Sequence, residues 1–138
     1  MISVVVVTHL DVAPHLIQAA ERVVGKQKNL FGINFHMDET FKSMTERVCG
    51  VISECSQSTD RPSPEILILT DLFGSTPTNA SCSQIQASPC SVQILTGVNL
   101  PMLISSLTYR DQLSLPELAQ KALTDARKGI RCIEFLTK

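Results

Sequence analysis

The sequence predicts an α/β protein with an open, flavodoxin-like parallel sheet. Runs of aliphatic and β-branched residues at 2–7 and 65–70 do not alternate with polar residues, which is typical of strands covered on both faces. Segments with helical spacing of apolar residues separate the strand-like runs, so strands and helices alternate along the chain. The length of 138 residues is enough for one domain, spanning 1–138, with its own core.

Two strand–helix units account for the first half of the chain. After the first strand, Asp11 suits the N-cap of a helix over 13–24, whose apolar residues recur at helical spacing up to the stop at Gly25. Alternating apolar side chains at 30–36 share one face of a second strand. An amphipathic helix over 41–52 follows, before a polar loop at 56–64 that contains two prolines.

The second half of the chain continues the alternation. After the strand at 65–70, Thr76 suits an N-cap and Pro77 suits the first position of a helix that ends near residue 87. The remaining expected elements are a strand at 91–96, a short helix capped by Asn99 and ending at 107, a helix at 115–128 and a fifth strand at 130–136. The βαβ units predict a parallel sheet of strand order 2-1-3-4, with right-handed crossovers.

Composition excludes several classes of protein. Twelve Lys and Arg residues are balanced by 13 Asp and Glu residues, so the chain lacks the basic footprint of a nucleic-acid-binding protein. No apolar run approaches the ~20 residues of a membrane span, and the start lacks the basic region of a signal peptide, so we expect a cytoplasmic protein without membrane insertion. The five cysteines form no C-x-x-C pair, and no histidines lie at zinc spacing, so neither a metal nor a cofactor is expected.

Polar residues follow the first and third strands, where parallel open sheets bind ligands. The strand order reverses between these two strands, and a crevice forms beyond their carboxyl ends. The residues there are Thr8 and His9 after the first strand, and Asp71, Gly74, Ser75 and Thr76 after the third. Each has an ordinary role when taken singly, as a solvated histidine, a turn residue or a helix cap. Together they supply an imidazole, a carboxylate that orients it and a helix N-terminus that binds anions, which are the parts of a phosphohistidine site.

Three motifs occur in order over essentially the whole chain. They are V-V-V-V-T-H at 4–9, L-T-D-L-F-G-S-T-P-T-N at 69–79 and T-G-V-N-L-P-M-L at 96–103, and the two later motifs are specific in combination. These motifs resemble the IIA component of the mannose/fructose/sorbose family of the bacterial sugar phosphotransferase system (PTS).

The resemblance implies a function and a set of site residues. His9 matches the histidine that accepts a phosphoryl group from the histidine-containing phosphocarrier protein and passes it to a IIB component for sugar uptake. Asp71 matches the carboxylate that hydrogen-bonds the ring nitrogen that is not phosphorylated. The phosphoryl-binding positions that the resemblance implies are Thr8, Gly74, Ser75 and Thr76.

The resemblance also implies a homodimer. Members of the family exchange a C-terminal strand between two subunits, and residues 130–136 match that strand, which would run antiparallel to the other four. One position departs from the family pattern, because Leu10 stands where a glycine usually follows the active histidine. A glycine there permits unusual backbone angles and close approach of a partner, so Leu10 is expected to narrow the docking surface or to change the loop.

Three other functions are compatible with this fold. The first is a regulatory phosphohistidine protein without a transport role, including the phosphoryl donor of a dihydroxyacetone kinase. The second is a receiver domain phosphorylated on Asp71, which needs an acidic pair after the first strand, where Asp11 is the only acid. The third is a flavodoxin-like binding module without chemistry, which the aromatic content of 4% disfavours.

Overall fold

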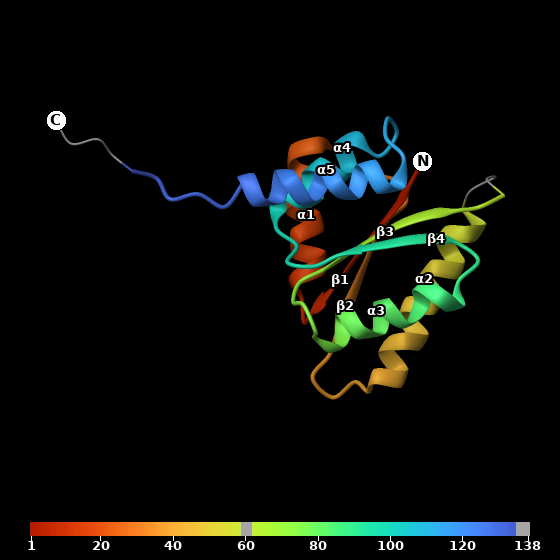
Figure 1. Cartoon of the computed structure of the whole chain (residues 1–138). Coiled ribbons are helices and arrows are strands. Elements are labelled where there is room, and N and C mark those ends of the chain that lie inside the picture. Colours follow the sequence, from red (N-terminus) through yellow and green to blue (C-terminus); the bar gives the residue numbers. More distant parts are fainter. Residues whose placement is uncertain (59–61, 135–138) are drawn as a thin grey trace.

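Four parallel strands form one sheet in the order β2-β1-β3-β4. The structure is a computed structural model that describes residues 1–58 and 62–134. The strands are β1 (Ser3–His9), β2 (Leu30–Phe35), β3 (Glu65–Thr70) and β4 (Ser91–Leu95), and β1 pairs with both β2 and β3. The predicted open parallel sheet and its strand order are therefore confirmed (Figure 1).

Helices cover both faces of the sheet. They are α1 (Val12–Val24), α2 (Phe41–Gln57), α3 (Thr76–Ala87), α4 (Leu100–Tyr109) and α5 (Leu115–Lys128). Val4 and Val6 of β1 belong to the core under α1, α4 and α5, whereas Val5 and Val7 belong to the core under α2 and α3. The unbroken apolar run of β1 is explained by this burial on both sides. No helix in the described part of the chain combines the length and apolar character needed to span a membrane.

Helices α1 and α2 each differ from the predictions at one end. Asp11 occupies the N-cap position of α1, but its side chain makes no capping hydrogen bond, and the Thr8 hydroxyl accepts the Ala13 N–H instead at 2.7 Å. Helix α2 continues to Gln57, into the predicted loop at 56–64. Cys55 is buried against the core, so the apolar side of α2 runs further than the polar sequence of this segment indicates.

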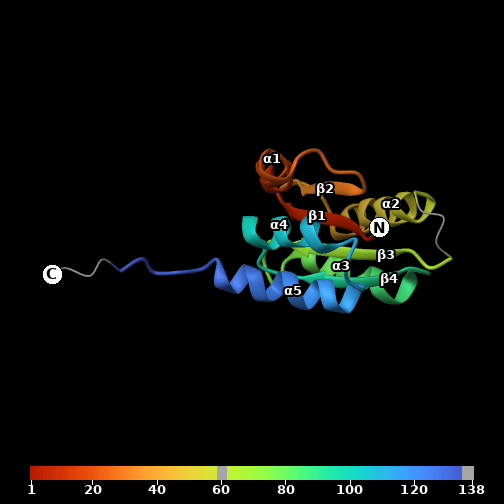
Figure 2. The same ribbon diagram turned by 90° about the horizontal axis from the view of Figure 1, so that it is seen from above.

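The described part of the predicted fifth strand does not belong to the sheet. Residues 130–134 form neither strand nor helix, and residues 135 and 136 lie outside the described residues. After α5 the chain runs away from the sheet in both views (Figures 1 and 2), with Ile130 and Ile133 exposed. A strand needs a neighbour for its backbone hydrogen bonds, and residues 130–134 pair with none in the described part of the chain.

A buried arginine makes hydrogen bonds to the backbone at the amino end of the sheet, which is the end opposite the predicted site. The guanidinium of Arg110, at the end of α4, donates hydrogen bonds to the carbonyl oxygens of Lys28 at 2.6 Å and Asn29 at 3.1 Å. Burial lowers the pKa of Arg110, and several carbonyl oxygens stand in for the lost water. This cluster fixes the entry into β2 and was not predicted from the sequence.

Candidate functional site

The imidazole of His9 lies at the carboxyl end of β1, between β2 and β3. The strand extends to His9, which pairs with Phe35 of β2, so Thr8 and His9 belong to the strand itself rather than to the loop after it. On the other side, Val7 pairs with Thr70, the last residue of β3. Asp71 follows directly, and the sheet therefore brings a carboxylate beside the histidine from 62 residues further along the chain.

One carboxylate oxygen of Asp71 holds both the backbone and the ring of His9. Oδ2 lies 2.8 Å from His9 Nδ1 and accepts the backbone N–H of His9 at 2.9 Å. The side chains are 38% and 19% exposed, so the ring is partly open to a partner while its anchor is more enclosed. The other oxygen, Oδ1, is buried and has no hydrogen-bond partner among the described residues.

This contact determines which ring nitrogen is free to react. An ionised carboxylate only accepts hydrogen bonds, so Nδ1 carries the proton in a neutral His9 and Nε2 keeps its lone pair. The ring of Phe35 meets the imidazole edge to face, with 5.9 Å between centroids and an interplanar angle of 86°. Two neighbours therefore hold the imidazole with Nε2 available as a nucleophile.

Hydroxyl groups fix the shape of the loop that follows Asp71. The carbonyl oxygen of Leu72 accepts the hydroxyl of Ser75 at 2.7 Å and the hydroxyl of Thr78 at 2.6 Å. Thr78 is buried, and its Oγ1 also lies 2.8 Å from the hydroxyl oxygen of Thr70. Gly74 adopts φ +75°, which favours glycine and closes the turn. Thr78 was not predicted as a site residue, although its place directly after Pro77, a proline that opens a helix, was visible in the sequence.

Helix α3 begins one residue earlier than predicted. Ser75 occupies the N-cap position and Thr76 is the first helical residue, with the first backbone hydrogen bond from Asn79 N–H to the Ser75 oxygen at 2.8 Å. Thr76 and Thr78 have backbone N–H groups that the helix leaves without an internal acceptor, whereas Pro77 has no N–H and that of Ser75 donates to the Leu72 carbonyl oxygen. The Thr76 hydroxyl has no hydrogen-bond partner among the described residues, whereas that of Ser75 is turned toward Leu72. An anion at this helix end would meet the Thr76 hydroxyl and free N–H groups.

Thr8 and the other two histidines of the chain take no part in the contact between His9 and Asp71. Thr8 is fully buried, and its hydroxyl is occupied by the first turn of α1. His15 and His36 are exposed, and in the described part of the chain only His9 among the histidines pairs with a carboxylate. The sequence thus identified the histidine and carboxylate that meet, but not that Thr8 turns away from them.

Comparison with known proteins points to one family. Residues 3–123 match the family described as the PTS system fructose IIA component, EIIA-man. The chain is 30% identical to the PTS system fructose-specific EIIA component of Bacillus subtilis (strain 168), and the alignment covers 100% of this chain and 91% of that protein.

Other relatives agree with this match. The chain is 29% identical to the PTS system mannose-specific EIIAB component of Escherichia coli (strain K12), with 96% of this chain and 40% of that protein covered. The crystal structure of phosphotransferase system component EIIA from Streptococcus agalactiae has a TM-score of 0.85 at 26% identity, with 96% of this chain and 97% of that chain covered. This chain therefore belongs to the mannose/fructose family of IIA components of the sugar phosphotransferase system.

Proposed function

We propose that His9 carries a phosphoryl group between two proteins of the PTS during sugar uptake. In this proposal the donor is the histidine-containing phosphocarrier protein and the acceptor is a IIB component. The observation that supports it best is the 2.8 Å contact between His9 Nδ1 and Asp71 Oδ2, which leaves Nε2 free on a partly exposed ring. Membership of a phosphotransferase-system family supports the same chemistry.

The transfer exchanges one P–N bond for another. Nε2 of neutral His9 attacks the phosphorus in line, the bond between phosphorus and the donor imidazole breaks, and its electron pair returns to the donor nitrogen. The proton on the other nitrogen of each ring stays in place, so no metal or co-reactant is required. Phosphoryl transfer of this kind is catalysed mainly by positioning and charge stabilisation. Asp71 serves both purposes, because it aligns the ring and offsets the positive charge that the ring acquires.

The start of α3 is our proposed cradle for the phosphoryl oxygens. The Thr76 hydroxyl and the free N–H groups of the first turn are donors suited to an anion, and the partial positive charge of a helix N-terminus favours it. Ser75 can contribute its hydroxyl only after releasing the carbonyl oxygen of Leu72. Gly74 gives the turn its shape, and Thr8 contributes by fixing the chain beside His9 rather than by contact.

We further propose a cytoplasmic homodimer in which the C-terminal segments are exchanged. Strand β4 lies at an open edge of the sheet, whose backbone groups can pair with another strand. The segment after α5 leaves its own subunit with Ile130 and Ile133 exposed, and an antiparallel pairing with β4 of a second copy would cover them.

The alternative functions differ in what they require of the site. A regulatory phosphohistidine protein, including a kinase's phosphoryl donor, would use the same His9 chemistry with another partner. A receiver domain would phosphorylate Asp71, but Oδ2 of this carboxylate already accepts two N–H groups from His9, and Oδ1 is buried. The geometry therefore favours histidine over aspartate as the phosphorylated residue.

The chemical stability of the phosphorylated protein tests this proposal. We expect the chain to become labelled when it is mixed with a phosphorylated phosphocarrier protein. The label should be lost in acid and kept in base, because the P–N bond of phosphohistidine is hydrolysed in acid and is stable in alkali. Loss of the label in base would instead identify an aspartyl phosphate and would refute the proposed role of His9.

A further inference from the structure

Leu10, directly after His9, has a backbone conformation that a leucine rarely adopts. Its φ is +43°, in the left-handed region, where a side chain with a β-carbon is disfavoured. The backbone that leads into Leu10 is held in place, because Leu10 N–H donates to the Phe35 carbonyl oxygen at 2.9 Å and His9 N–H donates to Asp71. The geometry of the histidine thus imposes this conformation on whichever residue follows it.

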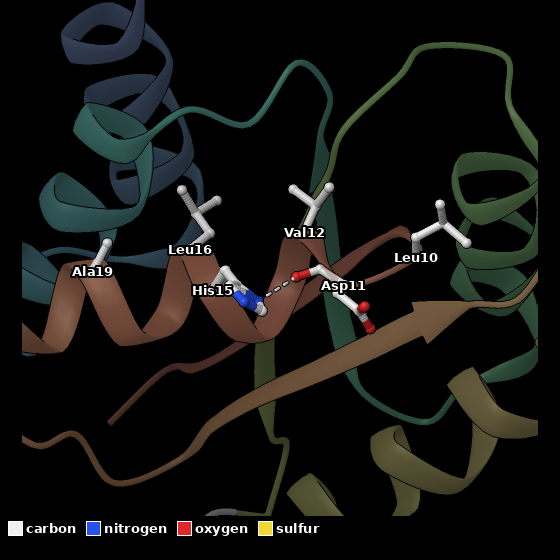
Figure 3. A pocket seen from close by; sticks show the side chains of 6 residues that line it. All are labelled: Leu10, Asp11, Val12, His15, Leu16 and Ala19. Carbon is white, nitrogen blue, oxygen red and sulfur yellow. Dashed lines mark hydrogen bonds between the residues drawn. The ribbon is translucent and has the colours of Figure 1, made fainter.

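The fold gains no core packing from the leucine. The side chain is 49% exposed, beside an open groove of about 680 Å³. In Figure 3, Val12, Leu16 and Ala19 project from the same side of α1, and Leu10 stands beyond the N-terminal end of the helix. The residues that line the groove are Leu10, Asp11, Val12, His15, Leu16 and Ala19.

Exposed apolar side chains also stand on the other loop of the site. Leu72 and Phe73, directly after Asp71, are 60% and 83% exposed. Apolar groups therefore follow both the histidine and its carboxylate in sequence. Groups of exposed apolar side chains mark protein interaction surfaces, and these three follow two residues that are in contact with each other.

Phosphoryl transfer determines what must cover Leu10. In an in-line transfer the phosphorus lies between two imidazole nitrogens, so the donor protein has to approach His9 to within a few ångströms. A folded donor that comes this close covers the residue next to the histidine. We propose that Leu10 is a specificity-determining residue, whose side chain packs against an apolar surface beside the phosphohistidine of the phosphocarrier protein. This inference depends on the proposed function and deepens it, because it assigns donor recognition to a residue that takes no part in the chemistry.

Two substitutions separate the side chain from the backbone. Leu10→Asn removes the apolar group but tolerates positive φ, whereas Leu10→Met keeps an apolar group of similar size. We expect Leu10→Asn to raise KM for the phosphorylated phosphocarrier protein about fivefold or more, the usual size for a contributing interface side chain, with little change in kcat. The KM of Leu10→Met for the same donor should stay near the wild-type value. Val23→Ala alters another exposed apolar residue, at the far end of α1, and should leave this KM unchanged.

A small phosphoryl donor supplies the control for reactivity. Phosphoramidate makes no contact with a docking surface, so Leu10→Asn should be phosphorylated by it at the wild-type rate. An unchanged KM for the phosphocarrier protein would overturn the inference, and so would equal losses with both donors, which would show that His9 itself is disturbed. Dissociation of a dimer by Leu10→Asn would also overturn it, because a second copy of the chain would then be the occupant.

A second variant keeps the test valid if Leu10→Asn fails to fold. Leu10→Gly also removes the side chain and accepts positive φ freely, and the same rise in KM is expected. The failure of this inference can be told apart from the failure of the proposed function. If Leu10 has no role, wild type and variants are labelled equally well by the phosphocarrier protein. If the proposed function is wrong, the wild-type chain itself is not labelled.

Discussion

His9→Ala is expected to abolish phosphoryl transfer from the phosphorylated phosphocarrier protein. The substitution removes the nucleophilic nitrogen, and no other imidazole in the described part of the chain is paired with a carboxylate. Because the wild-type side chain is partly exposed, the free energy of unfolding should change by only about 1 kcal/mol, from the loss of its contact with Asp71. Labelled phosphate retained by the protein after gel filtration measures the transfer.

Two matched variants control for this result. His15→Ala and His36→Ala each remove an exposed imidazole, one on α1 and one after β2. Both variants should be labelled as well as the wild type. If His9→Ala were labelled to the wild-type extent, the assignment of the phosphoryl acceptor would be wrong, and loss of label in one of the controls would move the acceptor to that residue.

Asp71→Asn is expected to slow the transfer by about 10⁴-fold, the loss found when the carboxylate that orients a catalytic histidine is replaced by its amide. The asparagine amide can place an N–H group opposite His9 Nδ1, where the wild type has an accepting oxygen. Nδ1 would then accept a hydrogen bond and the ring proton would move to Nε2, which would no longer carry a free lone pair. The loss should appear in kcat rather than in KM, and rapid-quench measurement of a single turnover can separate the two.

Asp71→Ala provides the comparison. Alanine removes the orienting group without supplying a competing donor, so transfer should be slowed while the fold stays intact. We expect Asp71→Ala to be less impaired than Asp71→Asn, because the imidazole can still adopt the reactive tautomer for part of the time. Transfer by Asp71→Ala at the wild-type rate would show that the carboxylate has no orienting role.

The position of the site could be predicted from sequence because strand order and strand identity are strongly encoded. The aliphatic runs of β1 and β3 are buried on both faces, and only a sheet covered by helices on both sides accommodates them. Once these two strands are neighbours, His9 and Asp71 must lie at the same edge of the sheet. Their convergence therefore followed from hydrophobic pattern and topology rather than from any local signal.

The hydrogen bonds within the site could not be predicted from hydrophobic pattern and strand order. The hydroxyl of Thr8 could have faced either a ligand or the next helix, and the choice depends on how β1 joins α1. Thr78 acts on Leu72 through a hydrogen bond of 2.6 Å that no pattern of apolar residues encodes. For Leu10, the sequence marked an unusual residue, but its left-handed backbone accompanies two hydrogen bonds, from its own N–H to Phe35 and from the N–H of His9 to Asp71.

The C-terminal segment shows a further limit of the sequence pattern. Apolar and β-branched residues at 130–136 resemble a strand, but a strand forms only where another strand offers a free edge. Within one subunit the described part of this segment meets no such edge. The pattern therefore indicates a capacity to pair, while the partner depends on the assembly.

The proposed transfer depends most on which ring nitrogen of His9 reacts with phosphorus. Nuclear magnetic resonance of the protein with ¹⁵N-labelled histidine can follow both ring nitrogens before and after phosphorylation. We predict a proton on Nδ1 and none on Nε2 in the free protein, and phosphorus bonded to Nε2 afterwards. Phosphorus on Nδ1, or a free protein whose proton resides on Nε2, would contradict the assignment of Asp71 as the group that holds the ring for transfer.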